Sequence, residues 1–396
     1  MIGRLTRLQL ENFLTWKSLD WRPSHPIACL IGENDSGKSN LLRSFEFLAD
    51  CAQKPFQEVF HQHRPFSHFA SPDSPWFRIA LEGRHTFKGR TQDFCYQLKV
   101  GQSFESGPTI VAEETLVLGD YELRRESERF YALQNGEKQP TIQVSPMQTL
   151  LNLMVKMSTD QLEVARALTN NPARAFAQDL SHFVSLRLNA TTMRAACEPD
   201  LPLLPSGQNL AAALDSLSSN PEYRAAFDTI QHRVQELLPR VKSVGVKSFR
   251  DGNGTSKRLL KFGSESAGKP FYFEADAASD GTLYVLALIL FSQNPNASGI
   301  SLVEEPELGL HPRLLESFVK QLREYARDQQ IILTTHSPLL LDSLSPEEVW
   351  VTTRDDQGFS ALTCMAGYPD LDRWRDNFNT GEIWMNIAEA QLATTE

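Results

Sequence analysis

The order of apolar and polar positions predicts buried strands near both ends of the chain. Residues 5–13 largely alternate between apolar and polar side chains, which is typical of a strand with one buried face. Three shorter runs are almost continuously apolar, as in strands that are buried on both faces. They are residues 26–31, 299–304 and 330–335. We therefore expect an α/β fold in which these runs are interior strands.

Helical spacing of apolar residues follows these strands. Apolar residues recur at this spacing from Leu41 to Leu48, so a helix is expected to begin near Lys38. Two further segments, 281–292 and 314–326, show the same kind of periodicity. Strands and helices thus alternate in the two terminal parts of the chain, which favours the α/β class.

The middle of the chain has a different pattern. Alternating apolar residues over about 76–133 predict antiparallel strands. Asp251-Gly252-Asn253-Gly254 lies between two extended runs and is a strong signal for a hairpin turn. The predicted helices of this region are residues 145–185 and 208–239, and the two hairpin strands are residues 241–249 and 257–262. The tail from residue 366 shows no clear period.

Composition narrows the class of protein. The chain has 396 residues, of which 41% are hydrophobic and 22% are charged, so a folded core is expected rather than disorder. Its net charge of −10 argues mildly against broad attraction to nucleic acid or anionic lipid, and leaves room for a local basic groove. The five cysteines are scattered, and no long apolar run is present. We therefore expect a cytoplasmic protein without a membrane segment.

The strongest chemical signal follows the first continuous apolar run. Gly32 and Gly37 allow tight turns, and Lys38 and Ser39 complete the spacing Gly-x-x-x-x-Gly-Lys-Ser. The backbone N–H groups of such a loop, and the start of the next helix, surround phosphate groups. We expect Lys38 to neutralise the β- and γ-phosphates of ATP and Ser39 to bind Mg²⁺. The predicted nucleotide-binding residues are Gly32, Glu33, Asn34, Asp35, Ser36, Gly37, Lys38, Ser39 and Asn40.

The second continuous apolar run ends in acidic residues. In a protein with a phosphate loop, one carboxylate at a strand end can hold Mg²⁺ through water, and the next can orient the attacking water. Glu304 is therefore assigned to Mg²⁺ and Glu305 to the general base. Glu307 is a weaker candidate, because a surface carboxylate explains it at least as well.

The third continuous run ends in a histidine. Residues 331–335 form the predicted buried strand, and His336 follows directly. Because the acidic strand lies only one predicted helix earlier, we expect His336 to reach the γ-phosphate and to sense its loss.

A short polar segment, Ser279-Asp280-Gly281-Thr282, precedes an apolar helix. Hydroxyl groups and backbone donors at a helix N-terminus can bind phosphate. The same residues can also form an ordinary N-cap, with Ser279 or Asp280 as the capping side chain. Taken by themselves, these residues favour the N-cap.

The order of these four motifs resembles the ABC-type ATPase head of the SMC/RecF/OLD-like group, in its stand-alone AAA-family ATPase branch. The resemblance covers roughly residues 1–50 and 270–345. Residues 4–13 resemble the opening strand of that group, and residues 308–312 are similar to its D-loop. The fold that it implies is a P-loop NTPase with an ABC-type head, an antiparallel β subdomain and a helical insertion.

The resemblance also implies an assembly. Two heads would form a head-to-tail homodimer with ATP between them. A trans signature would then contact the γ-phosphate bound by the other subunit, and it consists of Ser279, Asp280, Gly281 and Thr282. This chain departs from the family pattern at Glu304, where an aspartate is usual, and its signature is not the Ser-Gly-Gly-Gln of transporters.

The division of the chain follows from these motifs. We expect residues 1–100 to form the N-terminal part of the ATPase head, and residues 265–350 its C-terminal part. Residues 100–265 are expected to form an insertion or lid, and residues 351–396 a C-terminal tail. About sixty residues follow His336, which is too few for the Toprim domain that OLD-type relatives often carry. A nuclease function would therefore need a separate partner protein.

Two functions remain as hypotheses. The first is an ATPase that hydrolyses ATP with Mg²⁺ at the dimer interface and regulates an effector in DNA repair or antiphage defence, on family analogy. Its catalytic residues would be Glu305, Lys38 and His336. The alternative is a non-hydrolytic ATP-sensing scaffold that holds an effector or nucleic acid.

A basic stretch on the predicted hairpin bears on a nucleic-acid partner. Its side chains could contact phosphates, but a solvated hairpin face is the simpler interpretation, because the acidic chain has no wider basic field. The basic residues are Lys242, Lys247, Arg250, Lys257, Arg258 and Lys261.

Overall fold

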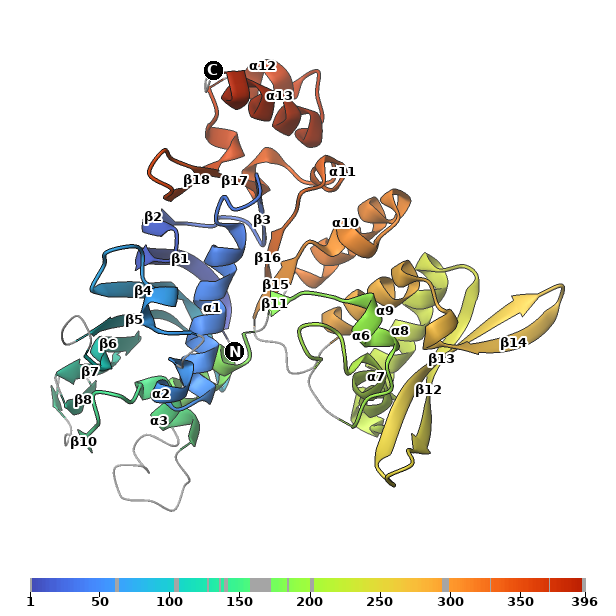
Figure 1. The fold of residues 1–396 in the computed structure, drawn as a ribbon, viewed down its shortest axis with the longest axis horizontal. Coiled ribbons are helices and arrows are strands. Elements are labelled where there is room, and N and C mark those ends of the chain that lie inside the picture. The colour runs from blue at the N-terminus through green and yellow to red at the C-terminus, as the bar shows by residue number, and fades with distance from the viewer. Residues whose placement is uncertain are drawn as a thin grey trace.

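Three β-sheets and the helices around them organise the chain in the computed structural model (Figure 1). The structure describes residues 2–60, 64–102, 107–126, 128–134, 137–138, 142–156, 172–183, 185–199, 203–293, 299–327, 329–369 and 371–393. The helices are α1 (Lys38–Gln53), α2 (Phe56–Val59), α3 (Leu150–Lys156), α5 (Pro172–Ser181), α6 (Ala190–Arg194), α7 (Leu210–Ser219), α8 (Arg224–Leu237), α9 (Asp280–Ser292), α10 (Pro312–Tyr325), α11 (Pro338–Leu341), α12 (Leu371–Arg375) and α13 (Thr380–Ala393). Short 3₁₀ turns are Phe66–His68, Pro221–Tyr223, Ala275–Ala277, Pro306–Gly309, Pro346–Glu348 and Met365–Gly367.

The central sheet contains the three continuous apolar runs. Its strands are β3 (Ile27–Gly32), β11 (Ser185–Leu186), β15 (Ile300–Glu304), β16 (Gln330–Thr334), β17 (Val349–Arg354) and β18 (Ser360–Cys364). Their order is β11-β15-β16-β3-β17-β18, and all neighbours are parallel except the antiparallel pair β17–β18. Every residue of β3 and β16 is buried, which confirms the burial predicted from their composition. Because β17 and β18 complete this sheet, the first part of segment 351–396 belongs to the central sheet and is not a separate tail.

The second sheet is antiparallel and has nine strands. They are β1 (Ile2–Phe13), β2 (Trp16–Trp21), β4 (Trp76–Phe87), β5 (Arg90–Gln102), β6 (Thr109–Leu118), β7 (Tyr121–Glu126), β8 (Arg129–Gln134), β9 (Glu137–Lys138) and β10 (Ile142–Gln143). The order is β10-β8-β7-β6-β5-β4-β1-β2, with β9 paired to β8. Helix α1 packs on this sheet, where Phe47 lies edge-on to Phe13 and Phe77, at 6.0 and 5.3 Å between ring centroids. The same core includes Leu30 of β3, so α1 is packed against both large sheets.

The third sheet projects from the helical part of the chain (Figure 1, yellow). It consists of β12 (Val241–Arg250), β13 (Ser256–Ser266) and β14 (Lys269–Glu274) in that order. The predicted hairpin is confirmed, and Asp251 Oδ1 accepts hydrogen bonds from the N–H groups of Asn253 and Thr255, at 3.0 and 2.9 Å. One face of this sheet is buried with the helices through Leu260 and Phe262.

Some expected elements differ from the structure. The helix predicted over 145–185 is wrong at both ends, because α3 begins only at Leu150 and Ser185–Leu186 forms strand β11 beside β15. Residues 157–171 of that segment lie outside the described residues. The segment 208–239 contains two helices, which a 3₁₀ turn at Pro221 separates. The tail that showed no period contains α12 and α13. Within the described residues, no helix combines the length and the apolar character needed to cross a lipid bilayer.

Candidate nucleotide-binding and hydrolysis site

The phosphate loop lies at the carboxyl edge of the central sheet, between β3 and α1. Ligands of α/β proteins bind at this edge, because the parallel strands all end there. Gly37 has a φ of 110°, and a Cβ atom at this position would lie 2.2 Å from Ser360 Oγ. Both observations require glycine. Lys38 is buried, and its Nζ donates to the carbonyl oxygens of Gly32 and Glu33 at 2.9 and 2.8 Å.

Lys38 lies in an environment that disfavours its own charge. Burial lowers the pKa of this ammonium group to about 8, while the nearby carboxylates of Glu305 and Asp35 oppose that change. An anionic ligand would restore the charge balance. The side chain is therefore suited to meet the phosphate groups of a nucleotide.

A cleft of about 680 Å³ brings the predicted residues together. Eight of its lining residues were predicted from sequence, namely Asn34, Asp35, Gly37, Lys38, Ser39, Asn40, Glu305 and His336. The predicted residues Gly32, Glu33, Ser36 and Glu304 do not line it. Three more lining residues were missed: Thr15, Arg43 and Arg354. Arg354 ends β17 and therefore reaches the same edge of the sheet as the phosphate loop. Thr15 lies after β1, and its Oγ1 accepts from Asn40 Nδ2 at 3.0 Å.

Glu304 contacts Ser39 of the phosphate loop, although the two residues are 265 positions apart in the sequence. Ser39 Oγ donates to Glu304 Oε2 at 3.3 Å, and only 12% of the Glu304 side chain is exposed. The other oxygen, Oε1, accepts from Arg187 Nε at 2.7 Å and from Ser185 Oγ at 3.1 Å. Mg²⁺ in nucleotide sites is held by few protein oxygens together with phosphate oxygens and water. The hydroxyl of Ser39 and the carboxylate of Glu304 fit that role.

Glu305 has an unusual backbone conformation. Its φ and ψ are 45° and 55°, in the left-handed region that non-glycine residues rarely adopt. Two backbone hydrogen bonds hold it there: its N–H donates to Thr334 O at 3.0 Å, and its carbonyl accepts from Leu308 N at 3.2 Å. Strain of this kind persists where the surrounding structure imposes it, and it is common at functional sites. It directs the Glu305 carboxylate into the cleft.

His336 lies opposite Glu305, and Glu307 holds its backbone. The His336 Nε2 and Glu305 Oε1 atoms are 3.6 Å apart. Partial burial and the ammonium group of Lys38 lower the pKa of His336, which favours a neutral ring. Glu307 Oε1 accepts from Thr335 Oγ1 at 2.7 Å and from the N–H of His336 at 2.8 Å. These contacts argue against the interpretation of Glu307 as a surface carboxylate without a structural role.

Comparison with known families agrees with this geometry. The model of the family described as "AAA domain, putative AbiEii toxin, Type IV TA system" matches residues 27–141 and 158–342. The match covers more than half of the chain and includes the phosphate loop, Glu304 and His336. The chain belongs to this family.

Two known proteins are similar in sequence to this AAA-domain protein. The Retron Vc95 probable ATPase of Vibrio cholerae serotype O1 biovar El Tor is 36% identical over 105 residues, which are 26% of this chain and 20% of the relative. The OLD nuclease of Thermus scotoductus is 23% identical over 393 residues, which are 95% of this chain and 67% of the nuclease. The chain thus spans about a fifth of the retron protein and two thirds of the nuclease.

A solved structure shares the fold. The crystal structure of an SMC head bound to the C-winged helix domain of ScpA aligns with a TM-score of 0.50 at 13% identity, over 91% of this chain and 97% of that chain. The likeness confirms the expected ABC-type head fold and the α/β class.

The signature segment caps a helix and lies outside the cleft of its own chain. Ser279 is the N-cap of α9, and its Oγ accepts from the N–H of Thr282 at 3.2 Å. The N-cap interpretation is therefore confirmed. Neither of these residues, nor Asp280 or Gly281, lines the cleft around Lys38. Whether they contact a nucleotide in a second subunit stays a prediction.

The basic stretch of the AAA-domain protein is partly neutralised. Three of its six side chains form ion pairs, and these pairs are Lys247–Glu274 at 2.5 Å, Lys257–Glu198 at 2.9 Å and Arg258–Asp215 at 2.5 Å. Pairing lowers the positive charge that a nucleic acid would meet. These three ion pairs favour the interpretation that the basic face of the hairpin is exposed to solvent and does not bind nucleic acid.

Proposed function

We propose that this protein binds Mg-ATP in the cleft and hydrolyses it. The observation that carries the proposal is the convergence of Lys38, Ser39 and Glu305 on one cleft, with Glu304 against Ser39. Lys38 and the loop amides would hold the phosphates and stabilise the charge that develops on them. Ser39 and Glu304 would hold Mg²⁺, which would neutralise the charge on the β- and γ-phosphate oxygens.

Glu305 is proposed as the group that receives the proton of the attacking water. The water oxygen forms a bond to the γ-phosphorus, and the bond from that phosphorus to the bridging oxygen breaks. ADP leaves with the electron pair, and the water proton passes to the carboxylate. The strained backbone of Glu305 supports this role, because it aims the side chain at the cleft. His336 would report the loss of the γ-phosphate through its contact with Glu305.

We also propose that two copies complete the site head to tail. The signature residues do not line the cleft of their own chain, and Ser279 and Asp280 are exposed. Leu308 follows the acidic strand and is 73% exposed, the largest fraction among the large apolar side chains of the described residues. We assign Leu308 to this interface, where a second copy would cover it.

The proposed biological role is control of a separate effector protein. It rests on the family of the chain and on its likeness to a retron ATPase and an OLD nuclease. DNA repair and antiphage defence are the settings that we propose. Residues 1–100 and 265–350, together with strands β11, β17 and β18, would form the nucleotide-driven head. The rest of residues 100–265 would form the insertion that carries its changes to the effector or to nucleic acid.

Phosphate release and mass in solution test the hydrolysis proposal directly. Wild-type protein is expected to release phosphate from Mg-ATP, and Glu305→Gln to do so at least about 100-fold more slowly while it still binds ATP. The variant should form an ATP-dependent dimer. Hydrolysis by Glu305→Gln at the wild-type rate would refute the assignment of the base. ATP binding by the wild type without any turnover would instead favour the non-hydrolytic scaffold.

The dimer is tested at Leu308. In the Glu305→Gln background, Leu308→Asp is expected to abolish the ATP-dependent dimer, because it places a charge in an apolar contact. The matched control is Tyr272→Asp, which changes a side chain that is 64% exposed on the projecting sheet. ATP binding should be the same in both variants. A dimer that persists in Leu308→Asp would count against this interface.

A further inference from the structure

Glu304 poses a geometric problem for the proposed metal site. Glutamate has one more rotatable bond than the aspartate expected at this strand end, so its carboxylate can adopt more positions. A metal ligand must be held in place by its neighbours to be effective. The following inference rests on the proposed Mg-ATP site and concerns the residues that hold Glu304.

Strand β11 and the residue that follows it place two such side chains, those of Ser185 and Arg187, beside the carboxylate. The strand runs parallel to β15, with Ser185 opposite Leu302 and Leu186 opposite Val303. Continuing this register brings Arg187 level with Glu304. Residues two apart on a strand share a face, so Ser185 and Arg187 reach the same carboxylate oxygen. Their distances to Glu304 Oε1 are 3.1 and 2.7 Å.

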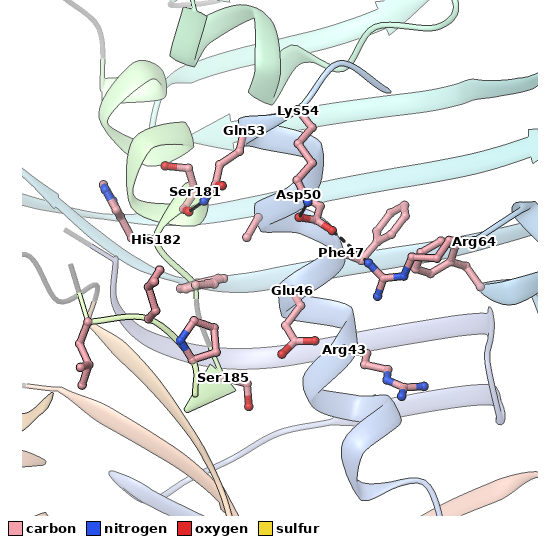
Figure 2. Close-up of a pocket in the computed structure, with 16 residues that line it drawn as sticks. Arg43, Glu46, Phe47, Asp50, Gln53, Lys54, Arg64, Ser181, His182 and Ser185 are labelled. Atoms are coloured by element: carbon pink, nitrogen blue, oxygen red, sulfur yellow. Dashed lines mark hydrogen bonds and ion pairs between the residues drawn. The ribbon is translucent and has the colours of Figure 1, made fainter. Parts of the chain in front are cut away.

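Arg187 also connects Glu304 to the helix that begins at the phosphate loop. Its Nη2 lies 3.2 Å from Glu46 Oε1 on α1. Glu46 and Ser185 line the same pocket of about 620 Å³, and Figure 2 shows Glu46 on α1 and Ser185 near it on the neighbouring segment. The guanidinium group therefore sits between two carboxylates, one on α1 and one on β15. Its planar fork can hold both at fixed angles.

Hydrogen bonds from the insertion and from α9 hold the backbone around Arg187. Its N–H donates to Pro205 O at 2.8 Å, and the next carbonyl, of Leu188, accepts from Tyr284 Oη at 2.9 Å. Tyr284 belongs to α9, the helix that begins at the signature segment. Two backbone hydrogen bonds thus hold the segment that carries Arg187.

The two oxygens of Glu304 therefore have different surroundings. Arg187 and Ser185 occupy Oε1, while Oε2 faces the hydroxyl of Ser39. We propose that Arg187 is a positioning residue that holds Oε1 of Glu304, so that Oε2 is presented beside Ser39 to the Mg²⁺ of Mg-ATP. This contact compensates for the longer side chain of glutamate at the strand end.

Equilibrium binding of ATP in EDTA and in Mg²⁺ separates this role from general stability. In EDTA, Arg187→Ala should bind ATP within about twofold of wild type, because Lys38 and the loop are unchanged. The gain in affinity on adding Mg²⁺ should fall about tenfold, as is typical when a residue that supports a metal ligand is lost. Phosphate release should need about tenfold more Mg²⁺ for half-saturation. Arg187→Lys, which keeps the charge, should recover part of the loss.

Arg323→Ala is the matched control. Arg323 forms a two-pronged ion pair with Glu348, at 2.7 and 2.6 Å, and Glu348 is buried while 12% of the Glu304 side chain is exposed. Its loss should lower the melting temperature and leave the effect of Mg²⁺ on ATP affinity unchanged. Neither Arg323 nor Glu348 lines the cleft.

A double-mutant cycle identifies the partner of Arg187. Glu304→Asp withdraws the carboxylate from the guanidinium group, so Arg187→Ala should add little in that background. Fully additive effects of the two changes on Mg²⁺-dependent affinity would overturn the inference. So would a wild-type response to Mg²⁺ in Arg187→Ala, or equal losses with EDTA and with Mg²⁺. If wild-type protein itself gained no affinity from Mg²⁺, the proposed Mg-ATP site would fail instead.

Discussion

The two large sheets each contain a carboxylate with little or no exposure beside an arginine, and only one of them belongs to the proposed site. Glu304 ends β15 of the parallel sheet and is 12% exposed, with Oε2 turned to Ser39 at the phosphate loop. Glu114 lies within β6 of the antiparallel sheet and is fully buried. Its oxygens accept from Tyr96 Oη and from Leu150 N, each at 2.8 Å.

The contrast shows that burial of a carboxylate does not by itself mark a site. Glu114 is enclosed between its own sheet and the start of α3, and its hydrogen bonds serve that packing. Burial raises its pKa to about 7, although the N–H of Leu150 and the charge of Arg125 oppose this. Parallel strands end together at one open edge, so a carboxylate there can face a ligand. Glu114, in the middle of β6, is covered by other parts of the chain and has no such opening.

The largest expected effect is a loss of ATP affinity when the phosphate loop beside the parallel sheet is changed. Lys38→Ala should weaken ATP binding by about 100-fold or more, because a buried charge-assisted contact with phosphate is lost. Lys54→Ala is the control, since Lys54 follows the other end of α1 and pairs with Asp50 at the surface. Equilibrium binding measures both. Equal affinities for ATP in Lys38→Ala and wild type would place the nucleotide elsewhere.

The next effect concerns the antiparallel sheet and depends on pH. Glu114 has an ordinary pKa of 4.5 and a folded-state pKa of about 7, so the folded protein holds its proton more tightly than the unfolded chain. This contribution is complete below about pH 4.5 and is lost as the pH rises through 7. At about 1.4 kcal/mol per pKa unit, it amounts to about 3 kcal/mol.

Urea unfolding at pH 5 and pH 7.5 measures this contribution. Glu114→Gln does not titrate, so the stability of wild type relative to the variant should fall as the pH rises. ATP binding should be unchanged, because Glu114 lies away from the cleft. If the difference in unfolding free energy between the two proteins were the same at both pH values, Glu114 would not have the raised pKa.

The smallest expected effect is on kcat and concerns Glu307, which supports His336 at the edge of the parallel sheet. Glu307→Ala removes two hydrogen bonds, to Thr335 Oγ1 and to the N–H of His336, and should lower kcat about tenfold. Glu307→Gln keeps an acceptor oxygen and should lose less. The KM for ATP should change little in either variant, because Glu307 does not line the cleft. A change in KM alone would show that Glu307 supports nucleotide binding and not His336.

Sequence patterns predicted most of the head. The loop Gly32–Ser39, the three apolar strands and the residues that follow them are local features, so their spacing and composition identify them. The hairpin at Asp251 was predicted for the same reason. Strand β11 was missed, because two residues that pair with a distant strand have no periodicity of their own. The helices of the tail also had no clear apolar face.

What the sequence determined by itself was therefore the chemistry of the phosphate loop and the ends of the strands beside it. The tertiary structure decided which side chains meet there: Ser39 with Glu304, Glu307 with His336, and Arg187 between Glu304 and Glu46. The physical reason is the parallel sheet. It brings strand ends that are hundreds of residues apart to one edge, and their register, which local sequence does not encode, sets which side chains are in contact.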